Sequence, residues 1–245
     1  MTVRLDVELV KRNFYQSRER AQKAVESGMV SVNGKLVKKV SYNIKLTDEI
    51  KTLGDPIGYV SRGGLKLKKG LEYWNINLLG LNVLDVGAST GGFTQCMLEA
   101  GAESVFAVDV GHGQLATGLL ENPKVINMEG TDIRGLRTSD FPFLFDFASI
   151  DVSFISLEKV LPEVKNFLKP EAGLICLIKP QFELDRRALN RRGLVRDPKL
   201  QILALEKVCS FAVQCGYAEI GHIDSPILGG DGNKEYLLFL KYWLQ

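Results

Sequence analysis

Residues 81–93 read Leu-Asn-Val-Leu-Asp-Val-Gly-Ala-Ser-Thr-Gly-Gly-Phe, and the rest of the chain can be interpreted from them. The apolar run at residues 82–86 has the length of a strand, a glycine turn begins at Gly87, and Gly91 and Gly92 are placed to begin a helix. In open α/β sheets this succession forms a nucleotide-type site at the carboxyl edge of the first strand. Glycine admits a close ligand there, and the helix start has free N–H groups. The stretch therefore predicts a ligand site in an α/β domain.

The glycine spacing alone fits mononucleotide, dinucleotide and S-adenosylmethionine (SAM) sites, and it also fits a turn that only packs a helix on a strand. A second predicted strand, residues 104–108, ends at Asp109. An acid about twenty residues after the glycines can accept hydrogen bonds from ribose hydroxyls. The turn lacks the full Gly-x-Gly-x-x-Gly pattern, and no Gly-Lys-Ser/Thr phosphate loop follows. Because SAM has no phosphates to bind, these absences favour SAM over a dinucleotide.

The composition is that of a soluble globular protein. The chain has 245 residues, of which 45% are apolar and 24% charged, enough for a core domain and one small additional domain. No apolar run approaches the roughly 20 residues that span a bilayer. Residues 1–6 carry charges where a signal peptide has its apolar stretch, so we expect a cytoplasmic protein with no membrane partner.

Cysteine and histidine usage argues against a metal site. Cys96, Cys176, Cys209 and Cys215 have no Cys-x-x-Cys spacing, and the chain contains 2 histidines. Cys96 and Cys176 lie in apolar segments, which predicts buried reduced thiols. We therefore expect no bound metal.

Charge is distributed unevenly along the chain. Residues 1–70 contain 15 Lys and Arg against 7 Asp and Glu, whereas the remaining residues contain 16 against 22. A basic front end on a mildly acidic body predicts that a polyanion is bound at the N-terminal end.

The N-terminal part predicts a small α/β module. Helices are expected over residues 4–11 and 19–27, a hairpin turn at Asn33-Gly34, and a closing strand over residues 44–50. This part resembles an S4 domain, a small RNA-binding module, over roughly residues 2–55. The resemblance rests on Arg-Leu-Asp at 4–6, Ser-Arg-x-x-Ala at 17–21 and Gly-x-Val-x-Val-Asn-Gly-x-x-Val-x-Lys at 28–39.

Modules of this kind bind mainly phosphates and RNA shape. A solvated basic surface without a partner is the alternative interpretation of such a charge run. The resemblance implies an RNA face that contains or adjoins Arg4, Arg18, Arg20, Lys23, Asn33, Lys35 and Lys39, and we add Arg62 from the segment that follows.

Domain boundaries follow from Gly-Asp-Pro-Ile-Gly at residues 54–58, which is typical of a linker. We predict an S4 domain over residues 1–55, a linker over 56–64 and a second domain over 65–245. Residues 183–199, with five arginines, predict a mobile loop that forms a second substrate contact. In the second domain we expect strands at 82–86, 104–108, 125–128, 145–150, 172–178, 217–224 and 234–240, and helices at 65–74 and 200–214.

Four charged residues of the second domain stand at ends of these elements. Lys66 begins a helix, Asp151 and Lys179 each follow a strand, and Glu235 lies at the start of the last strand. A lysine that ends an apolar strand needs a partner, and Asp151 can supply one. The set resembles the Lys-Asp-Lys-Glu tetrad of ribose 2′-O-methyltransferases of the RrmJ/FtsJ type.

With the S4 domain, the whole chain resembles the TlyA family, several members of which carry haemolysin names. The most specific stretches are Tyr59-Val-Ser-Arg-Gly, Asp85-Val-Gly-Ala-Ser-Thr-Gly-Gly-Phe-Thr, Asp109-Val-Gly-His-Gly-Gln-Leu, Asp151-Val-Ser-Phe-Ile-Ser and Ile178-Lys-Pro-Gln-Phe-Glu. The resemblance implies a Rossmann-like α/β SAM-dependent methyltransferase domain, a seven-stranded sheet with helices on both faces. It also implies methylation of cytidine riboses in ribosomal RNA.

The tetrad suits this chemistry. A ribose 2′-hydroxyl is a weak acid and must lose its proton as it attacks the methyl carbon, and a lysine able to take a proton can act as the base. We expect Lys179 to be the base or hydroxyl-orienting group, with Asp151 as its partner. Lys66 and Glu235 are expected to hold the target ribose, and positioning of the reactants supplies much of the rate.

The resemblance also implies a cofactor set. The glycine turn and helix start would surround the methionine part and sulfonium, the acid after the second strand would bind the ribose, and the next loop would border the adenine. A loop N-cap is the alternative role for Asp132. The residues implied around the methionine part and sulfonium are Gly87, Ala88, Ser89, Gly91, Gly92 and Phe93, with Asp85 at the methionine amine. Those implied at the ribose are Asp109 and Val110, and those at the adenine are Asp132 and Ile133.

The leading hypothesis is thus a cytoplasmic SAM-dependent methyltransferase that acts on RNA of ribosomal subunits, not on DNA, with the target nucleotide swung out of its stack. One alternative is a non-catalytic assembly factor that binds ribosomal RNA. A membrane-active haemolysin is the other, and the absence of an apolar spanning run argues against it. S4 domains also precede pseudouridine synthases, but the glycine turn and the tetrad do not fit that chemistry. The oligomeric state is left open.

Overall fold

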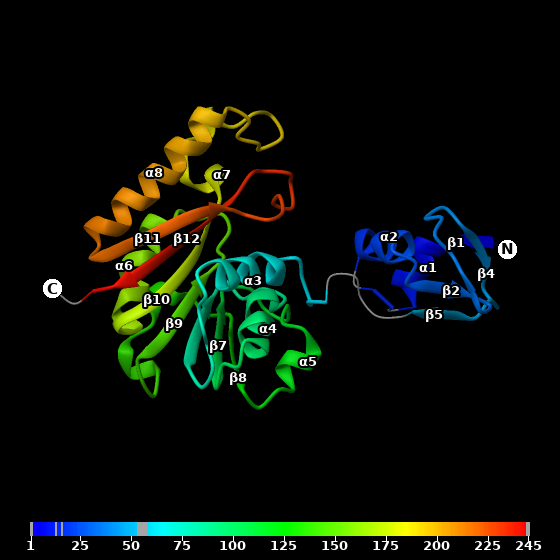
Figure 1. Cartoon of the computed structure of the whole chain (residues 1–245), viewed down its shortest axis with the longest axis horizontal. Coiled ribbons are helices and arrows are strands. Elements are labelled where there is room, and N and C mark those ends of the chain that lie inside the picture. The colour runs from blue at the N-terminus through cyan, green and yellow to red at the C-terminus, as the bar shows by residue number, and fades with distance from the viewer. Residues whose placement is uncertain (1, 13, 16, 53–57, 244–245) are drawn as a thin grey trace. The chain divides into compact units, whose positions relative to one another are not determined.

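The computed structural model describes residues 2–12, 14–15, 17–52 and 58–243 (Figure 1). It divides into two compact units, Met1–Tyr59 and Val60–Gln245. Most of Gly-Asp-Pro-Ile-Gly at 54–58, and the first residues of the linker expected at 56–64, lie outside the described residues.

The first unit packs two helices against two small sheets. Ser17 caps the second helix, since its Oγ accepts a hydrogen bond from the Arg20 N–H at 3.3 Å. Leu5, Leu9 and Val25 are buried in the unit's apolar core. The elements are β1 Thr2–Arg4, α1 Leu5–Lys11, α2 Arg18–Glu26, β2 Val30–Val32, β3 Lys35–Leu36, β4 Asn43–Lys45 and β5 Ile50–Thr52, in the sheets β1-β4 and β3-β2-β5.

The closing strand expected over residues 44–50 is wrong. The segment forms two strands in different sheets, because β4 pairs with β1 and β5 pairs with β2. A turn separates them, in which the Asp48 carboxylate accepts from the Lys45 N–H at 2.7 Å and from Asn33 Nδ2 at 3.0 Å. The hairpin turn at Asn33-Gly34 is confirmed between β2 and β3, with positive φ at both residues.

The second unit is built on a seven-stranded sheet in the order β11-β12-β10-β9-β6-β7-β8. β12 runs antiparallel to β10 and β11, and the other pairs are parallel. All seven strands expected from the sequence are present. They are β6 Asn82–Val86, β7 Ser104–Asp109, β8 Val125–Glu129, β9 Phe145–Ile150, β10 Leu168–Ile178, β11 Tyr217–Asp224 and β12 Tyr236–Tyr242.

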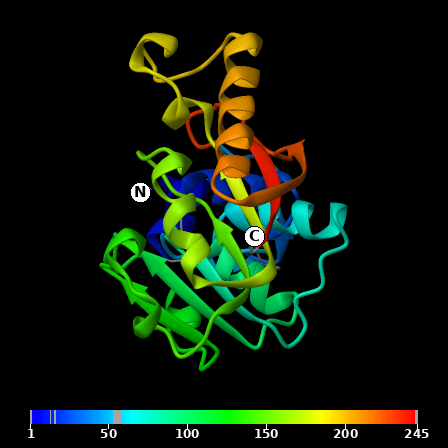
Figure 2. The same ribbon diagram turned by 90° about the vertical axis from the view of Figure 1, so that its left-hand side faces the viewer.

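Helices cover both faces of this sheet. On one face, alternate β10 residues such as Leu174 and Cys176 belong to the core cluster that includes Val208 of α8. On the other, a Cβ added at Gly70 of α3 would touch Ile175 and Leu237. Figure 2 shows α8 running alongside the C-terminal strand pair. The helices are α3 Gly63–Tyr73, α4 Gly92–Glu99, α5 Thr117–Leu120, α6 Leu161–Val164, α7 Pro180–Glu183 and α8 Pro198–Gln214, with 3-10 turns at Ile133–Gly135, Thr138–Asp140, Leu157–Lys159, Lys165–Phe167 and Arg186–Ala188.

Several boundaries differ from the expected ones. α3 begins at Gly63 instead of Leu65, and β12 begins at Tyr236, so Glu235 immediately precedes the strand. The basic stretch at 183–199 is held at several points. The buried Val195 donates its N–H to Asn233 Oδ1 at 3.0 Å, Asn233 Nδ2 donates to the Gly193 carbonyl at 3.1 Å, and Gln201 donates to the Val195 carbonyl at 2.7 Å. The mobility expected of this stretch stays a prediction.

Candidate active site

The carboxyl ends of the central strands form the site. β6, β9 and β10 are neighbours in the sheet, and the residues that follow them are Gly87, Asp151 and Lys179. Because parallel neighbours end at one edge, these residues meet there. Gly87 has φ +84°, and a Cβ at this position would lie 2.6 Å from the Asp151 carbonyl oxygen. Only glycine therefore allows this turn and the end of β9 to approach so closely.

Two cavities open at this edge. The large cavity, about 620 Å³, is bordered by the loops after β6, β7 and β9. The small cavity, about 280 Å³, lies between the start of α3, the glycine turn and Lys179. Gly87, Ser89, Asp151 and Ser153 line both, so the two cavities adjoin. A molecule in the large cavity can therefore present a group to the residues of the small one.

Asp109 stands at the wall of the large cavity, at the end of β7. Its carboxylate accepts hydrogen bonds from the Ser89 N–H at 2.8 Å and the Gly111 N–H at 2.7 Å. These bonds join the glycine turn to the loop after β7 and fix the carboxylate at the position where sequence analysis expects a ribose.

Asp132 lines the same cavity and also caps the turn that follows it. It accepts the Arg134 N–H at 3.0 Å, and its side chain forms an ion pair with the Arg134 guanidinium at 2.6 Å. The hydrogen bond from Arg134 is the main cause that lowers the pKa of Asp132. The capping role considered from the sequence is therefore present, and a contact of this residue with adenine stays a prediction.

The predicted tetrad forms two ion pairs. Lys66 Nζ lies 2.6 Å from Glu235 Oε2, and Lys179 Nζ lies 2.7 Å from Asp151 Oδ1. Lys179 also donates to Ser153 Oγ at 2.9 Å. Lys66, Lys179 and Glu235 are buried, and a buried charge is tolerated in a protein interior only when it is paired in this way.

Sheet register explains why these residues meet. Ile178 of β10 lies opposite Tyr236 of β12, so the end of one strand adjoins the start of the other. Lys179 and Glu235 flank that pair on the same edge of the sheet. Lys66 reaches the edge from the first turn of α3 and lines the small cavity with Asp151 and Lys179.

Glu183 holds two loops of the site together. Its carboxylate accepts from Ser156 Oγ at 2.6 Å and from the Leu157 N–H at 3.0 Å. The pKa of Glu183 is raised, because the effect of burial exceeds the lowering by these two hydrogen bonds. The contact fixes the loop after β9, which carries Asp151, to the helix after Lys179.

Asp85 lies outside both cavities. It is fully buried and accepts from Thr94 Oγ1 at 2.6 Å and Ser149 Oγ at 2.9 Å. Burial raises its pKa to about 7. Successive strand residues face opposite sides, so Val86 lines the large cavity while Asp85 points toward α4. The expected contact of Asp85 with the methionine amine is therefore wrong, because the carboxylate does not face either cavity.

The other expected cofactor residues divide between the cavities. Gly91 is outside both, and a Cβ at Gly91 would meet Leu115 and Leu119, so it serves packing. Gly87, Ser89, Asp109, Val110, Asp132 and Ile133 line the large cavity, whereas Ala88, Gly92 and Phe93 join Gly87 and Ser89 around the small one.

Phe154 is a site residue that sequence reasoning missed. Its side chain is 91% exposed, its φ is +63°, and it lines the large cavity. The ring lies 5.2 Å from that of Phe182, which follows Lys179 by three residues. The motif Asp-Val-Ser-Phe was recognised, but neither the left-handed backbone nor the exposure of the ring is visible in the sequence.

The residues expected at an RNA face have different environments. The expectation that Arg20 lies on the RNA face is wrong. Arg20 is buried, and its guanidinium donates a hydrogen bond to the Tyr59 carbonyl. Arg4 and Arg18 both pair with the buried Asp6, at 2.9 and 2.8 Å. Lys23, Asn33, Lys35 and Lys39 are exposed, and Arg62 lines the small cavity in the second unit.

Comparison with known families agrees with this architecture. The family model described as FtsJ-like methyltransferase matches residues 59–242, and the S4 domain model matches residues 3–50. The chain belongs to the FtsJ-like methyltransferase family. It is therefore an enzyme, a SAM-dependent methyltransferase, with an S4 domain at its N-terminus.

Similar proteins extend over nearly the whole chain. YqxC of Bacillus subtilis, named as an rRNA methyltransferase, is 43% identical over 241 residues, which are 98% of this chain and 85% of the relative. The 16S/23S rRNA (cytidine-2′-O)-methyltransferase TlyA of Mycobacterium tuberculosis is 38% identical over 239 residues, which are 97% of this chain and 89% of the relative. A solved structure of a hemolysin-named protein from Streptococcus thermophilus is 41% identical, with a TM-score of 0.77 over 99% of this chain and 89% of that one.

The large cavity suits SAM. Its volume lies within the roughly 300–1,000 Å³ of small-molecule sites. It combines a glycine turn that only glycine can form, a fixed carboxylate at Asp109 and the apolar Val110 and Ile133.

Within the described residues, none of the helices is both long and apolar enough to cross a membrane.

Proposed function

We propose that this FtsJ-like enzyme transfers the methyl group of SAM to the 2′-hydroxyl of a cytidine ribose in ribosomal RNA. The observation that carries the proposal is the pairing of Lys179 with Asp151 where the two cavities adjoin. The name of the TlyA relative from Mycobacterium tuberculosis supports the substrate, since it specifies cytidine-2′-O-methylation of rRNA.

Lys179 is the proposed base or hydroxyl-orienting group. Asp151 and Ser153 both contact its Nζ, and all three residues line the small cavity. To act as the base, Lys179 must first lose its ammonium proton to solvent. Its neutral amine would then accept the proton of a 2′-hydroxyl placed there as the oxygen attacks, whereas the charged form would only orient the hydroxyl. Lys66, held by Glu235, lines the same cavity and would orient the ribose there.

We assign the cofactor to the large cavity. Ser89 and the glycine turn would hold the methionine part, Asp109 the ribose, and Asp132 with Ile133 the border of the adenine. SAM, when bound, supplies a methyl group on a positively charged sulfur that needs no further activation. The residues of the chain then act chiefly by aligning the ribose oxygen with that methyl carbon.

Phe154 is proposed to support the target base. A nucleotide stacked in a folded RNA must be swung out before its ribose can enter a cavity of this size. An aromatic ring that is exposed at the rim offers a face on which the displaced base can stack, whatever its sequence context.

The S4 unit is proposed to bind the RNA. Its exposed lysines Lys35, Lys38 and Lys39 follow one hairpin turn, and phosphate contacts from such side chains give affinity without sequence selectivity. Ribosomal subunits are the proposed partners, and the cytoplasm, where ribosomes reside, is the proposed location.

The test is transfer of labelled methyl from SAM to purified 30S, 50S and 70S particles from a strain that lacks this gene. We expect label in the RNA of at least one particle with the wild type and none with Lys179→Ala. SAM binding without transfer to any particle would instead support an RNA-binding assembly factor. Lysis of erythrocytes by pure protein, unaffected by Lys179→Ala, would support a haemolysin.

A further inference from the structure

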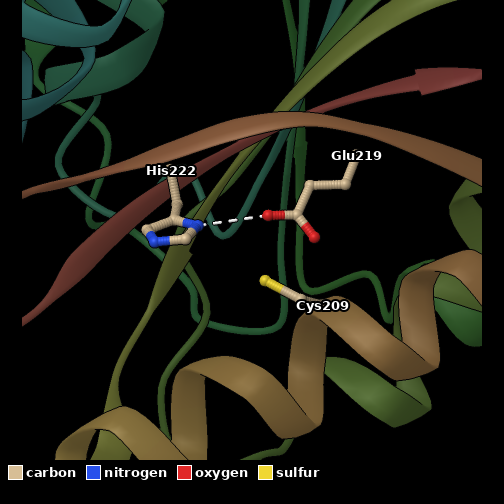
Figure 3. A group of neighbouring side chains, drawn as sticks. All are labelled: Cys209, Glu219 and His222. Atoms are coloured by element: carbon tan, nitrogen blue, oxygen red, sulfur yellow. Dashed lines mark hydrogen bonds and ion pairs between the residues drawn. The ribbon is translucent and has the colours of Figure 1, made fainter.

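A second cluster of chemically reactive side chains lies in a groove between α8 and β11. The groove has a volume of about 840 Å³, and Cys209 of α8 faces Glu219 and His222 of β11 across it. The Cys209 Sγ, a Glu219 carboxylate oxygen and a His222 ring nitrogen all lie within 4.8 Å of one another. In Figure 3 the imidazole and the carboxylate face each other, and the thiol points toward both.

A β-bulge brings the two strand residues together. Residues three apart on a regular strand face opposite sides of the sheet. In β11 the register shifts between Glu219 and Gly221, so Glu219 lies opposite Leu240 while His222 lies opposite Leu238. The extra residue turns Glu219 and His222 to the same face, the one that α8 covers. Nδ1 of His222 is then 3.1 Å from Glu219 Oε1.

The three donors form a set that Zn²⁺ prefers. Zinc binds cysteine sulfur, histidine nitrogen and carboxylate oxygen at about 2.0–2.3 Å, which places tetrahedral donors roughly 3.5 Å apart. Movements of about 1 Å would bring the present donors to that spacing. Glu219 and His222 are exposed and free to make this adjustment, and water in the open groove can supply the fourth ligand.

We propose that Cys209, Glu219 and His222 bind one Zn²⁺ ion that ties α8 to β11. β11 is an edge strand of the seven-stranded sheet, with β12 as its strand neighbour. A metal link would therefore strengthen the attachment of a strand that has pairing on one side. Binding as thiolate requires that the Cys209 proton leave to solvent.

The sequence argued against a metal because its cysteines have no Cys-x-x-Cys spacing and it contains 2 histidines. Cys209, Glu219 and His222 become neighbours only through the bulge and through the packing of α8 on the sheet. Among the described residues, the groove shares none with the large or small cavity, so the site is independent of methyl transfer.

The test uses the full-length protein, treated with a chelator and then titrated with Co²⁺ as a coloured substitute for Zn²⁺. We expect one equivalent to produce thiolate-to-cobalt charge-transfer absorption in the near ultraviolet, and Zn²⁺ to abolish it. Cys209→Ser should lose the absorption. Cys215→Ser is the matched control, because this half-buried cysteine lies at the end of the same helix and outside the cluster.

Two further variants keep the test independent of folding defects. His222→Ala replaces an exposed side chain, and Glu219→Gln keeps the size and shape of a half-buried one. Both should weaken Zn²⁺ binding more than about tenfold, because losing even a residue that only supports a metal ligand costs at least that much. Zn²⁺ should raise the melting temperature of the wild type and not of His222→Ala, while methylation rates of both stay equal. Absence of the absorption, its survival in Cys209→Ser, or equal zinc affinity in His222→Ala would overturn the proposal.

Discussion

Lys179 is fixed by two contacts on its charged end and lines the small cavity, not the large one. Replacing it by alanine removes the proposed base and leaves the proposed SAM site intact. We expect Lys179→Ala to lower the methyl-transfer rate by at least about 100-fold, the lower range for loss of a general base, with SAM affinity changed less than about twofold.

Rates with saturating SAM and calorimetric titration of SAM measure the two effects of Lys179→Ala separately. Lys69→Ala is the matched control, since this exposed lysine lies on α3 away from the cavity linings. Full activity of Lys179→Ala, with an unchanged melting temperature, contradicts the assignment.

Asp85 predicts a pH dependence of stability. Its pKa is raised to about 7 in the folded chain by burial, against about 3.9 in an unfolded one, so the folded state binds more protons between these values. The contribution of Asp85 to the free energy of unfolding should therefore be largest below about pH 4 and fall as the pH rises to about 7. The loss amounts to about 4 kcal/mol from this group.

Asp85→Asn isolates this contribution. The variant cannot ionise at this position, so its stability relative to the wild type should increase as the pH rises from about 4 to 7. Urea unfolding of both proteins across that range measures the difference. Other buried carboxyls such as Glu183 are present in both proteins, so their contributions to the pH dependence cancel in the difference. A difference that does not vary with pH would show that Asp85 ionises normally.

At the scale of elements, the loop after β9 presents both Asp151 and the exposed ring of Phe154. Stacking of a base on an aromatic ring contributes about 1–3 kcal/mol. Phe154→Ala should therefore lower kcat/KM for the RNA roughly 5- to 150-fold, with SAM affinity unchanged, and Phe154→Tyr should restore the rate.

Tyr73→Ala is the control for Phe154→Ala, because it removes an equally large exposed ring from α3. Steady-state rates at varied RNA concentration provide the measurement. An equal, small effect of both substitutions would mean that Phe154 has no role in holding the base.

The sequence was sufficient for elements whose signals are local. The strands around the glycine turn and the meeting of Asp151 with Lys179 follow from apolar runs and from the rule that parallel strands end at one edge. What failed depended on contacts between distant residues. The turn that divides residues 44–50 rests on the bond between Asp48 and Asn33, and the burial of Arg20 depends on a carbonyl 39 residues away.

The direction in which a side chain points from its strand or loop was the second feature that could not be predicted from the sequence. The alternation of a strand decides that Asp85 faces α4, although its position beside the glycine turn suggested a ligand contact. The bulge in β11 and the positive φ of Phe154 have no marker in the sequence. These are the features that define the groove between α8 and β11 and the rim of the large cavity.

At the scale of the whole molecule, the charge difference between the two parts of the chain predicts a salt-dependent contribution from the S4 unit. Replacing Lys35, Lys38 and Lys39 with glutamate should raise KM for ribosomal particles and reduce the dependence of log affinity on log salt by about 2, since each phosphate contact contributes roughly 0.7–0.9. SAM affinity should not change.

Lys124→Glu, at an exposed lysine of the second unit, is the control for the triple variant. KM measured at several salt concentrations tests the prediction. A salt dependence equal to that of the wild type would mean that these lysines do not contact phosphates in the complex.

The identity of the methylated atom tests the central claim most directly. RNA from particles labelled by the wild-type enzyme should be digested to nucleosides and analysed by mass spectrometry. The account predicts 2′-O-methylcytidine from a linkage that resists alkaline hydrolysis, and its absence with Lys179→Ala. A methyl group on a base atom, or the same product from Lys179→Ala, would contradict the proposal that Lys179 and Asp151 activate a ribose hydroxyl.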